Sequence, residues 1–121
     1  MELNLTRPLL FFDIESTGLV ISADSIVELC FLKVFPDGST QPKTWRIRPW
    51  DYLQNRQKPI NPEASKVTGI RDEDLVSCPT FFSLTKEIAG WLKDCDLAGF
   101  NSARFDLPLL AEEFERAKRF K

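Results

Sequence analysis

The alternation of hydrophobic and polar positions in the first half of the chain predicts three consecutive strands. Residues 8–14 form a short apolar run, and residues 25–35 (SIVELCFLKVF) are apolar on both sides, as expected of a central strand. Residues 36–38 (PDG) predict a turn. Residues 44–48 (TWRIR) then alternate apolar and basic side chains, which is typical of a half-exposed strand. Three successive strands predict an antiparallel meander.

A polar segment and two helices are predicted to follow the meander. Residues 49–59 (PWDYLQNRQKP) predict a long loop, and Asn61 is positioned to cap a short helix that Gly69 ends. Residues 81–92 place their apolar side chains on one helical face, with Thr80 as the N-cap.

The last part of the chain predicts one more strand and one more helix. Residues 96–100 (DLAGF) predict a short buried strand. The helix after it is indicated by apolar residues at helical spacing: Leu107, Leu110, Phe114 and Ala117. Glu112 and Arg116 are spaced for an ion pair on its outer face. The order of three strands, helix, strand and helix predicts an α/β fold.

Two carboxylates stand at the end of the first predicted strand, in the stretch FFDIESTGL at residues 11–19. Positions i and i+2 of a strand point to the same side, so Asp13 and Glu15 are expected to lie together. Two like charges this close favour a bound cation, and hard divalent ions such as Mg²⁺ prefer oxygen ligands. The alternative is that these carboxylates lie at an exposed strand end or cap the following turn.

A third carboxylate, Asp106, follows the predicted strand at residues 96–100. It lies at the start of the last predicted helix, so it is a second candidate ligand. Its alternative role is an ordinary N-cap, with Pro108 in the first helical turn.

Composition restricts the chemistry further. The chain has 121 residues, of which 43% are hydrophobic and ten are Phe, which is enough for one globular domain. Its 16 Lys and Arg residues against 18 Asp and Glu residues exclude a general basic field for nucleic acid. The chain contains no His, which removes the usual general base, so the chemistry is expected to depend on carboxylates.

The remaining sequence features concern the cellular setting. The three cysteines form no CxxC pair, which argues against a zinc site or a disulfide framework. No stretch resembles a signal peptide or a membrane span. We therefore expect a soluble, cytoplasmic protein without a membrane partner.

Three stretches together resemble the DEDD-type 3′→5′ exonucleases, the group that includes the epsilon proofreading subunit of bacterial DNA polymerase III. The stretch at residues 11–19 is similar to the first motif of this family. Residues 60–75 (INPEASKVTGIRDEDL) are similar to its connecting segment, and residues 99–114 (GFNSARFDLPLLAEEF) to its second motif.

The resemblance implies a ribonuclease H-like fold, with a mixed sheet flanked by helices. It also implies that residues 1–121 are the N-terminal part of a single exonuclease domain, because the third motif of the family, a His followed by an Asp, is not in this chain. The C-terminal strand and helix of the fold are expected to be missing with it.

The resemblance assigns Asp13, Glu15 and Asp106 as catalytic, metal-binding carboxylates for two divalent cations, Mg²⁺ or Mn²⁺. It also implies contacts with the 3′-terminal nucleotide, in which the backbone around Ser16 and Thr17 meets the sugar and Leu19 packs against the base. The substrate-binding residues expected on this basis are Ser16, Thr17, Gly18, Leu19, Asn101 and Phe105.

The implied activity is hydrolysis of the terminal phosphodiester of single-stranded or frayed DNA, or of RNA, with release of nucleoside 5′-monophosphates in proofreading or repair. The expected partners are nucleic-acid 3′ ends and a DNA polymerase or other replication and repair proteins. Without the third motif, we expect the chain alone to be weakly active or inactive. We also expect exposed apolar surface that favours self-association.

Two other functions are compatible with the sequence. One is a non-catalytic nucleic-acid-binding or polymerase-associated subunit that keeps these carboxylates. The other is an aspartyl-phosphate phosphohydrolase, because residues 13–17 (DIEST) partly match a DxDxT nucleophile motif. That motif is followed by a helix, whereas residues 25–35 predict a strand.

Overall fold

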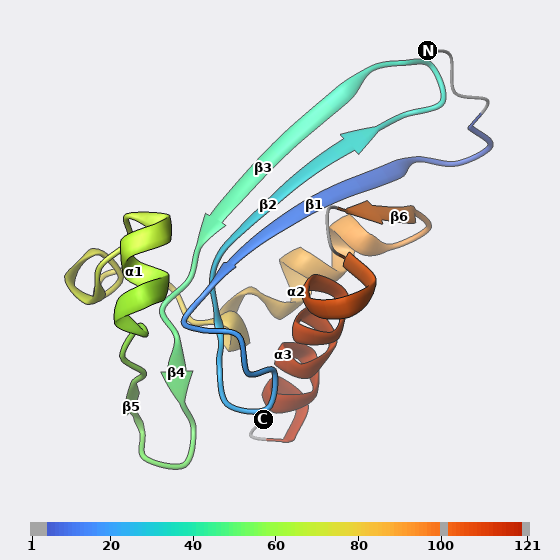
Figure 1. Ribbon diagram of the computed structural model, residues 1–121. Helices are drawn as coiled ribbons and strands as arrows, with labels where there is room; N and C mark the ends of the chain where they lie inside the picture. The colour runs from blue at the N-terminus through green and yellow to red at the C-terminus, as the bar shows by residue number, and fades with distance from the viewer. Residues whose placement is uncertain (1–4, 100–101, 120–121) are drawn as a thin grey trace.

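The computed structural model describes residues 5–99 and 102–119, and a four-stranded mixed sheet forms its centre (Figure 1). The strands are β1 (Leu9–Ser16), β2 (Ile26–Val34), β3 (Thr40–Arg46) and β6 (Asp96–Gly99), in the order β3-β2-β1-β6. β1, β2 and β3 are antiparallel neighbours, whereas β6 lies parallel to β1. The predicted meander and mixed α/β fold are confirmed.

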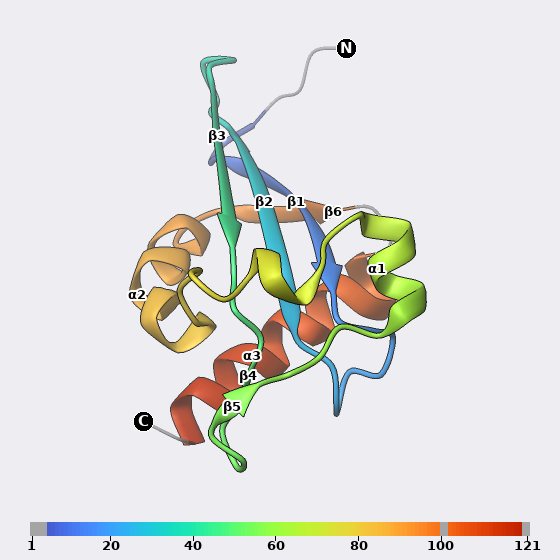
Figure 2. The ribbon, with the colours of Figure 1, turned by 90° about the vertical axis from the view of Figure 1, so that its left-hand side faces the viewer.

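Helices lie on both sides of this sheet. α2 (Phe81–Leu92) and α3 (Leu107–Arg119) cover one face, and α1 (Pro62–Thr68) lies on the other side (Figures 1 and 2). Two short helical turns, Asp72–Asp74 and Ser102–Asp106, connect these elements. Among the residues that the structure describes, no helix is both long and apolar enough to cross a bilayer.

The main core lies between the sheet and the two longer helices. Alternate residues of β1 point into it, and Leu10, Phe12 and Ile14 are buried. Phe31 and Trp45 pack edge to face, with their ring centroids 5.1 Å apart. Further buried members come from β2, α2 and α3, namely Leu29, Ile88, Leu109 and Leu110. This packing holds β1 firmly in place.

The predicted helix ends of α1 and α2 are confirmed. The Asn61 side chain accepts a hydrogen bond from the Glu63 backbone N–H, and Gly69 ends α1 with a φ of 76°. The Thr80 side chain accepts from the Ser83 backbone N–H at the start of α2.

The prediction of a long loop at residues 49–59 is wrong, because this segment contains a small hairpin. β4 (Trp50–Asp51) pairs with β5 (Arg56–Gln57) in antiparallel register, and Asn55 in the connecting turn has a φ of 54°. The Arg48 guanidinium lies 4.9 Å from the centroid of the Trp50 ring. This cation–π contact helps a largely polar segment to form strands.

The prediction of a buried strand at residues 96–100 is also wrong in one respect. The strand exists as β6, but Asp96 and Leu97 are exposed. The reason is its position, because among the described residues β6 has only β1 as a neighbour and forms an edge of the sheet. Phe100 is outside the described residues.

The last helix differs from the prediction at its start and on its outer face. The π-helical turn Ser102–Asp106 continues directly into α3, so Asp106 is not a simple N-cap. Arg116 is buried rather than exposed. Its guanidinium lies 3.7 Å from the carboxylate of Glu112, but its shorter contacts are to other groups.

Candidate active site

β1 presents Asp13 and Glu15 on the face of the sheet that α2 and α3 leave open. Ile14 between them points into the core and is only 7% exposed. The Ile14 backbone N–H donates a 3.0 Å hydrogen bond to Asp13 Oδ1. The two carboxylates are thus fixed by a strand whose opposite face is packed.

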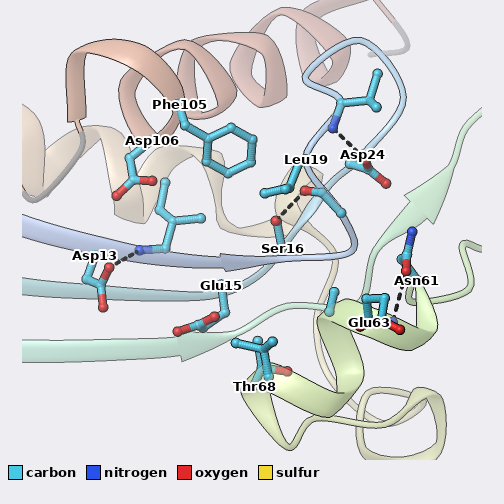
Figure 3. Close-up of a pocket in the computed structure, with 15 residues that line it drawn as sticks. Asp13, Glu15, Ser16, Leu19, Asp24, Asn61, Glu63, Thr68, Phe105 and Asp106 are labelled. Carbon is cyan, nitrogen blue, oxygen red and sulfur yellow. Dashed lines mark hydrogen bonds between the residues drawn. The ribbon is translucent and has the colours of Figure 1, made fainter.

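These carboxylates line a pocket with a volume of about 930 Å³ (Figure 3). Its walls come from the end of β1, the loop before β2, the helix α1 and the turn before α3. Asp106 and Phe105 enter from that turn, more than 85 residues away from β1 in sequence. The structure therefore brings together Asp13, Glu15 and Asp106, as the sequence predicts.

The pocket is strongly acidic. Its described lining has no Lys or Arg and contains five carboxylates: Asp13, Glu15, Asp24, Glu63 and Asp106. Burial, with added repulsion from Asp13 and Glu15, raises the pKa of Asp106 to about 6. Burial and the charges of Asp13 and Glu28 also raise the pKa of Glu15. A cation in this pocket would relieve that repulsion.

The three candidate ligands share the pocket without forming a closed ligand set. Across residues 5–99 and 102–119, no three carboxylate, thiol or imidazole groups lie close enough together to hold one ion. Asp13 and Glu15 come from one wall and Asp106 from another (Figure 3). Side-chain rotation is therefore required before all three contact the same ion.

The predicted substrate-binding residues occupy different positions. Ser16, Gly18, Leu19 and Phe105 line the pocket, and Leu19 is 83% exposed at its rim. Asn101 lies outside the described residues.

Thr17, whose backbone is expected beside the sugar from the family resemblance, is buried and is not part of the lining. Its backbone N–H donates to the Ser25 carbonyl at 2.9 Å, and its own carbonyl accepts from the Asn61 N–H at 2.8 Å. Both backbone groups are therefore already used within the protein.

α1 supplies a wall of the pocket that sequence reasoning about single residues missed. Ala64, Val67 and Thr68 face the pocket, and Val67 is 84% exposed. An apolar Val on the outside of a short polar helix is the available signal, but one exposed apolar residue is common on protein surfaces. Only the position of α1 opposite β1 makes it informative.

The loop between β1 and β2 forms one wall of the pocket, and its packing at Gly18 leaves little room for a side chain. A Cβ atom on Gly18 would lie 2.5 Å from Asp24 Oδ2. Asp24 is held there because its carboxylate accepts hydrogen bonds from Thr17 Oγ1 and from the Val20 N–H, each at 2.8 Å. Asp24 and Val20 also line the pocket and were not predicted.

A mixed sheet with acidic residues on its central strand and on the turn before the last helix is the arrangement expected of a ribonuclease H-like nuclease. The chain belongs to the exonuclease family, since the family profile RNase_T matches residues 10–121.

Two relatives by sequence are DNA polymerase III proteins. The chain is 29% identical over 106 residues to a DNA polymerase III PolC-type protein of Bacillus cereus, covering 88% of this chain and 7% of that protein. It is 29% identical over 108 residues to the DNA polymerase III subunit epsilon of Treponema pallidum, covering 89% of this chain and 46% of that subunit. The chain thus spans less than half the length of either relative.

The fold also matches solved structures. Exonuclease I of E. coli in complex with a dT13 oligonucleotide superposes with a TM-score of 0.79 at 19% identity, over 93% of this chain and 24% of that protein. Another structure of the E. coli protein with single-stranded DNA is described as its zinc ion bound form. The similarity confirms the ribonuclease H-like fold that the sequence predicts.

Proposed function

We propose that this chain is part of a metal-dependent 3′→5′ exonuclease that removes nucleoside 5′-monophosphates from single-stranded or frayed DNA. The observation that carries the proposal is the meeting of Asp13, Glu15 and Asp106 in one pocket from two distant parts of the sequence. Membership of the exonuclease family supports it.

The donor set fits hard divalent cations. Carboxylate oxygens are the ligands that Mg²⁺ and Mn²⁺ prefer, and this pocket has an excess of negative charge with no basic residue in its described lining. Asp13, Glu15 and Asp106 would hold the ions, two of them in the proposed enzyme. When bound, such ions activate a water molecule and stabilise the charge that develops on the scissile phosphate.

The residues of the chain itself bind and orient the 3′-terminal nucleotide. Leu19 and Phe105 give the pocket apolar surface on which a base can pack, and Ser16 and Gly18 lie beside the carboxylates where a sugar would enter. Asn101 belongs to the same proposed set. Thr17 contributes indirectly, by hydrogen bonding to Asp24 in the loop.

We also propose that residues 1–121 are the N-terminal part of a single exonuclease domain. The chain has no His, so the group that accepts the proton of the attacking water would come from another segment. The open sheet face beside Asp13 leaves room for such a segment. On this proposal, the chain alone binds metal weakly and hydrolyses slowly, and its partners are DNA or RNA 3′ ends and a DNA polymerase.

The proposal is tested with a 5′-labelled single-stranded DNA oligonucleotide and Mn²⁺. The chain, a version extended along its natural reading frame and the extended Asp13→Asn variant are compared on a sequencing gel. We expect a ladder shortened from the 3′ end with the extended protein, and a loss of roughly 10²-fold or more in rate with Asp13→Asn.

Glu87→Gln in the extended protein is the matched control. Glu87 lies on α2, outside the pocket, and its carboxylate is 3.6 Å from Lys43 Nζ, so its loss should leave the rate unchanged. If the extended protein leaves both DNA and RNA intact but binds them, the chain belongs to a non-catalytic nucleic-acid-binding subunit instead.

A further inference from the structure

The loop of residues 17–25 between β1 and β2 carries two apolar side chains at the pocket on a rigid base. Leu19 and Val20 are 83% and 56% exposed, and both line the pocket. Behind them, the Val20 carbonyl accepts hydrogen bonds from the N–H groups of Ala23 and Asp24, and the Asp24 carboxylate accepts from the Val20 N–H. Three hydrogen bonds within the loop therefore link Val20, at the exposed tip, to Ala23 and Asp24.

A buried ion pair on α3 attaches this loop to the rest of the protein. Arg116 Nη1 donates to the Asp24 carbonyl at 2.7 Å and to Glu113 Oε1 at 2.9 Å, and Nη2 donates to the Ile21 carbonyl. Glu113 Oε2 in turn accepts from the Ile26 N–H at 3.1 Å. The Arg116 and Glu113 side chains are only 7% and 4% exposed.

Stability alone is a poor explanation for this arrangement. A buried ion pair loses hydration, and hydrophobic residues of the same volume often stabilise a fold as well or better. What the pair provides is geometry, because the planar guanidinium directs several N–H groups along fixed lines. Arg116 thereby binds two loop carbonyls and Glu113 at once from two nitrogens in a fixed plane, whereas a Lys has a single nitrogen whose donors have no fixed directions.

α3 also follows directly from the turn that contributes Asp106 and Phe105. The same helix therefore connects to opposite sides of the pocket, through Asp106 at its start and through Arg116 in its last turns.

The loop of residues 17–25 is also held by a side chain outside α3. Lys58, next to β5, donates from its Nζ to the Ala23 carbonyl at 3.0 Å. The loop is fixed relative to the carboxylates by these contacts.

We propose that Arg116 is a positioning residue, which holds the 17–25 loop so that Leu19 and Val20 meet the 3′-terminal nucleotide at a set distance from the carboxylates. This inference rests on the proposed function. Arg116 lies behind the loop and does not line the pocket, so it acts only through the loop. Loosening the loop should weaken nucleotide binding although every contact residue is still present.

The test compares Arg116→Lys with Arg119→Lys in the extended protein. Arg116→Lys keeps the charge opposite Glu113 and so limits the risk of unfolding. Arg119 is on the same helix, is exposed and bonds to Glu112 at 2.9 Å without touching the loop, which makes it the matched control. Amide hydrogen exchange reports on the loop, and fluorescence anisotropy of a labelled dT oligonucleotide with Ca²⁺ reports on binding.

We expect Arg116→Lys to speed exchange at the Val20, Ala23 and Asp24 amides by roughly tenfold or more, with the amides of β1 and β2 unchanged. Binding of the oligonucleotide should weaken roughly fivefold or more. Arg119→Lys should match the unmodified protein in both measurements.

Two outcomes overturn the inference alone. One is unchanged exchange of the loop amides in Arg116→Lys, and the other is a loosened loop with full oligonucleotide affinity. A different result, in which the unmodified extended protein binds neither DNA nor RNA, overturns the proposed function and this inference with it.

Discussion

The two faces of the central sheet differ although they are built from the same strands. On the face beneath α2 and α3, Phe12 and Ile14 of β1 are buried with Leu29 of β2. On the opposite face, Phe11 is 40% exposed and Asp13 is exposed beside the pocket. One face is a packed core, and the other carries the candidate site.

The difference shows how one strand separates stability from binding. Successive residues of a strand point to opposite sides, so packing of Phe12 and Ile14 fixes the backbone of Asp13 without using its side chain. The packed side chains therefore keep the carboxylates of Asp13 and Glu15 close together although their charges repel. Substitutions on the packed face should therefore change the free energy of unfolding, whereas those on the open face should mainly change binding.

The largest expected effect is on Phe12, and its neighbour Phe11, which points to the opposite face, provides the comparison. Phe12→Ala should lower the free energy of unfolding by about 3–5 kcal/mol, because it leaves a cavity between the sheet and the helices. Phe11→Ala should lower it by about 1 kcal/mol or less, because the ring is already partly in water. Urea denaturation measures both values, and equal losses would contradict the distinction between the faces.

A smaller effect is expected at Gly18, in the loop that follows β1. Gly18→Ala should lower the free energy of unfolding by about 1–3 kcal/mol, because the added Cβ displaces the Asp24 carboxylate from its two hydrogen bonds. Oligonucleotide binding should weaken as well.

Gly90→Ala is the control for that substitution. Gly90 lies within α2, and, apart from its chain neighbours and the backbone of the helix itself, no heavy atom of the described residues is within 4 Å of its ideal Cβ position. Alanine there should raise the free energy of unfolding by about 0.5–1 kcal/mol in the same denaturation experiment. A tolerated Gly18→Ala with normal binding would show that the loop does not need its present shape.

The free energy of unfolding should depend on pH through Asp106. The pKa of Asp106 is raised from its ordinary 3.8 to about 6, so its contribution to stability is present below about pH 4 and is lost as pH rises through 6. Without metal, Asp106→Asn should therefore raise the free energy of unfolding by about 1–2 kcal/mol at pH 8, with no gain at pH 4. Denaturation with a chelator present tests this, and a loss of stability at pH 8 would contradict it.

The smallest effect is expected at Glu28 of β2, on the open face of the sheet. Glu28 lies opposite Glu15 in the register and forms a 3.0 Å ion pair with the exposed Arg46. Glu28→Gln should change the free energy of unfolding by only about 0.5 kcal/mol, because exposed ion pairs contribute little. It should lower the pKa of Glu15, which NMR titration of the side-chain carboxyl measures. A Glu15 pKa that stays the same would show that Glu28 does not act on the site.

Local patterns predicted much of the fold because the forces involved are local. The N-caps Asn61 and Thr80 and the C-terminal Gly69 depend on bonds between residues a few positions apart, and all three were placed correctly. The position of Asp13 and Glu15 on the same side of β1 follows from the strand period alone. These features need no knowledge of distant segments.

The errors arose where a distant contact decides the environment. Arg116 has the spacing of an exposed helical ion pair, but the loop before β2 covers it and takes its hydrogen bonds. Leu97 belongs to an apolar run, but β6 lies at an edge of the described sheet. The hairpin of β4 and β5 depends on pairing between short polar segments, which has no apolar signature.

The sequence by itself determined the order of the four sheet strands and of the three α-helices, the DxE pair on β1 and the excess of carboxylates over other catalytic groups. The resemblance to the exonuclease family already placed Asp106 with Asp13 and Glu15, but only the tertiary structure decided the other walls of the pocket. It placed Val67 of α1 across from the carboxylates and turned Thr17 inward to hold Asp24. The physical reason is that strand and helix periods act over a few residues, whereas the pocket is formed by packing between segments far apart in the chain.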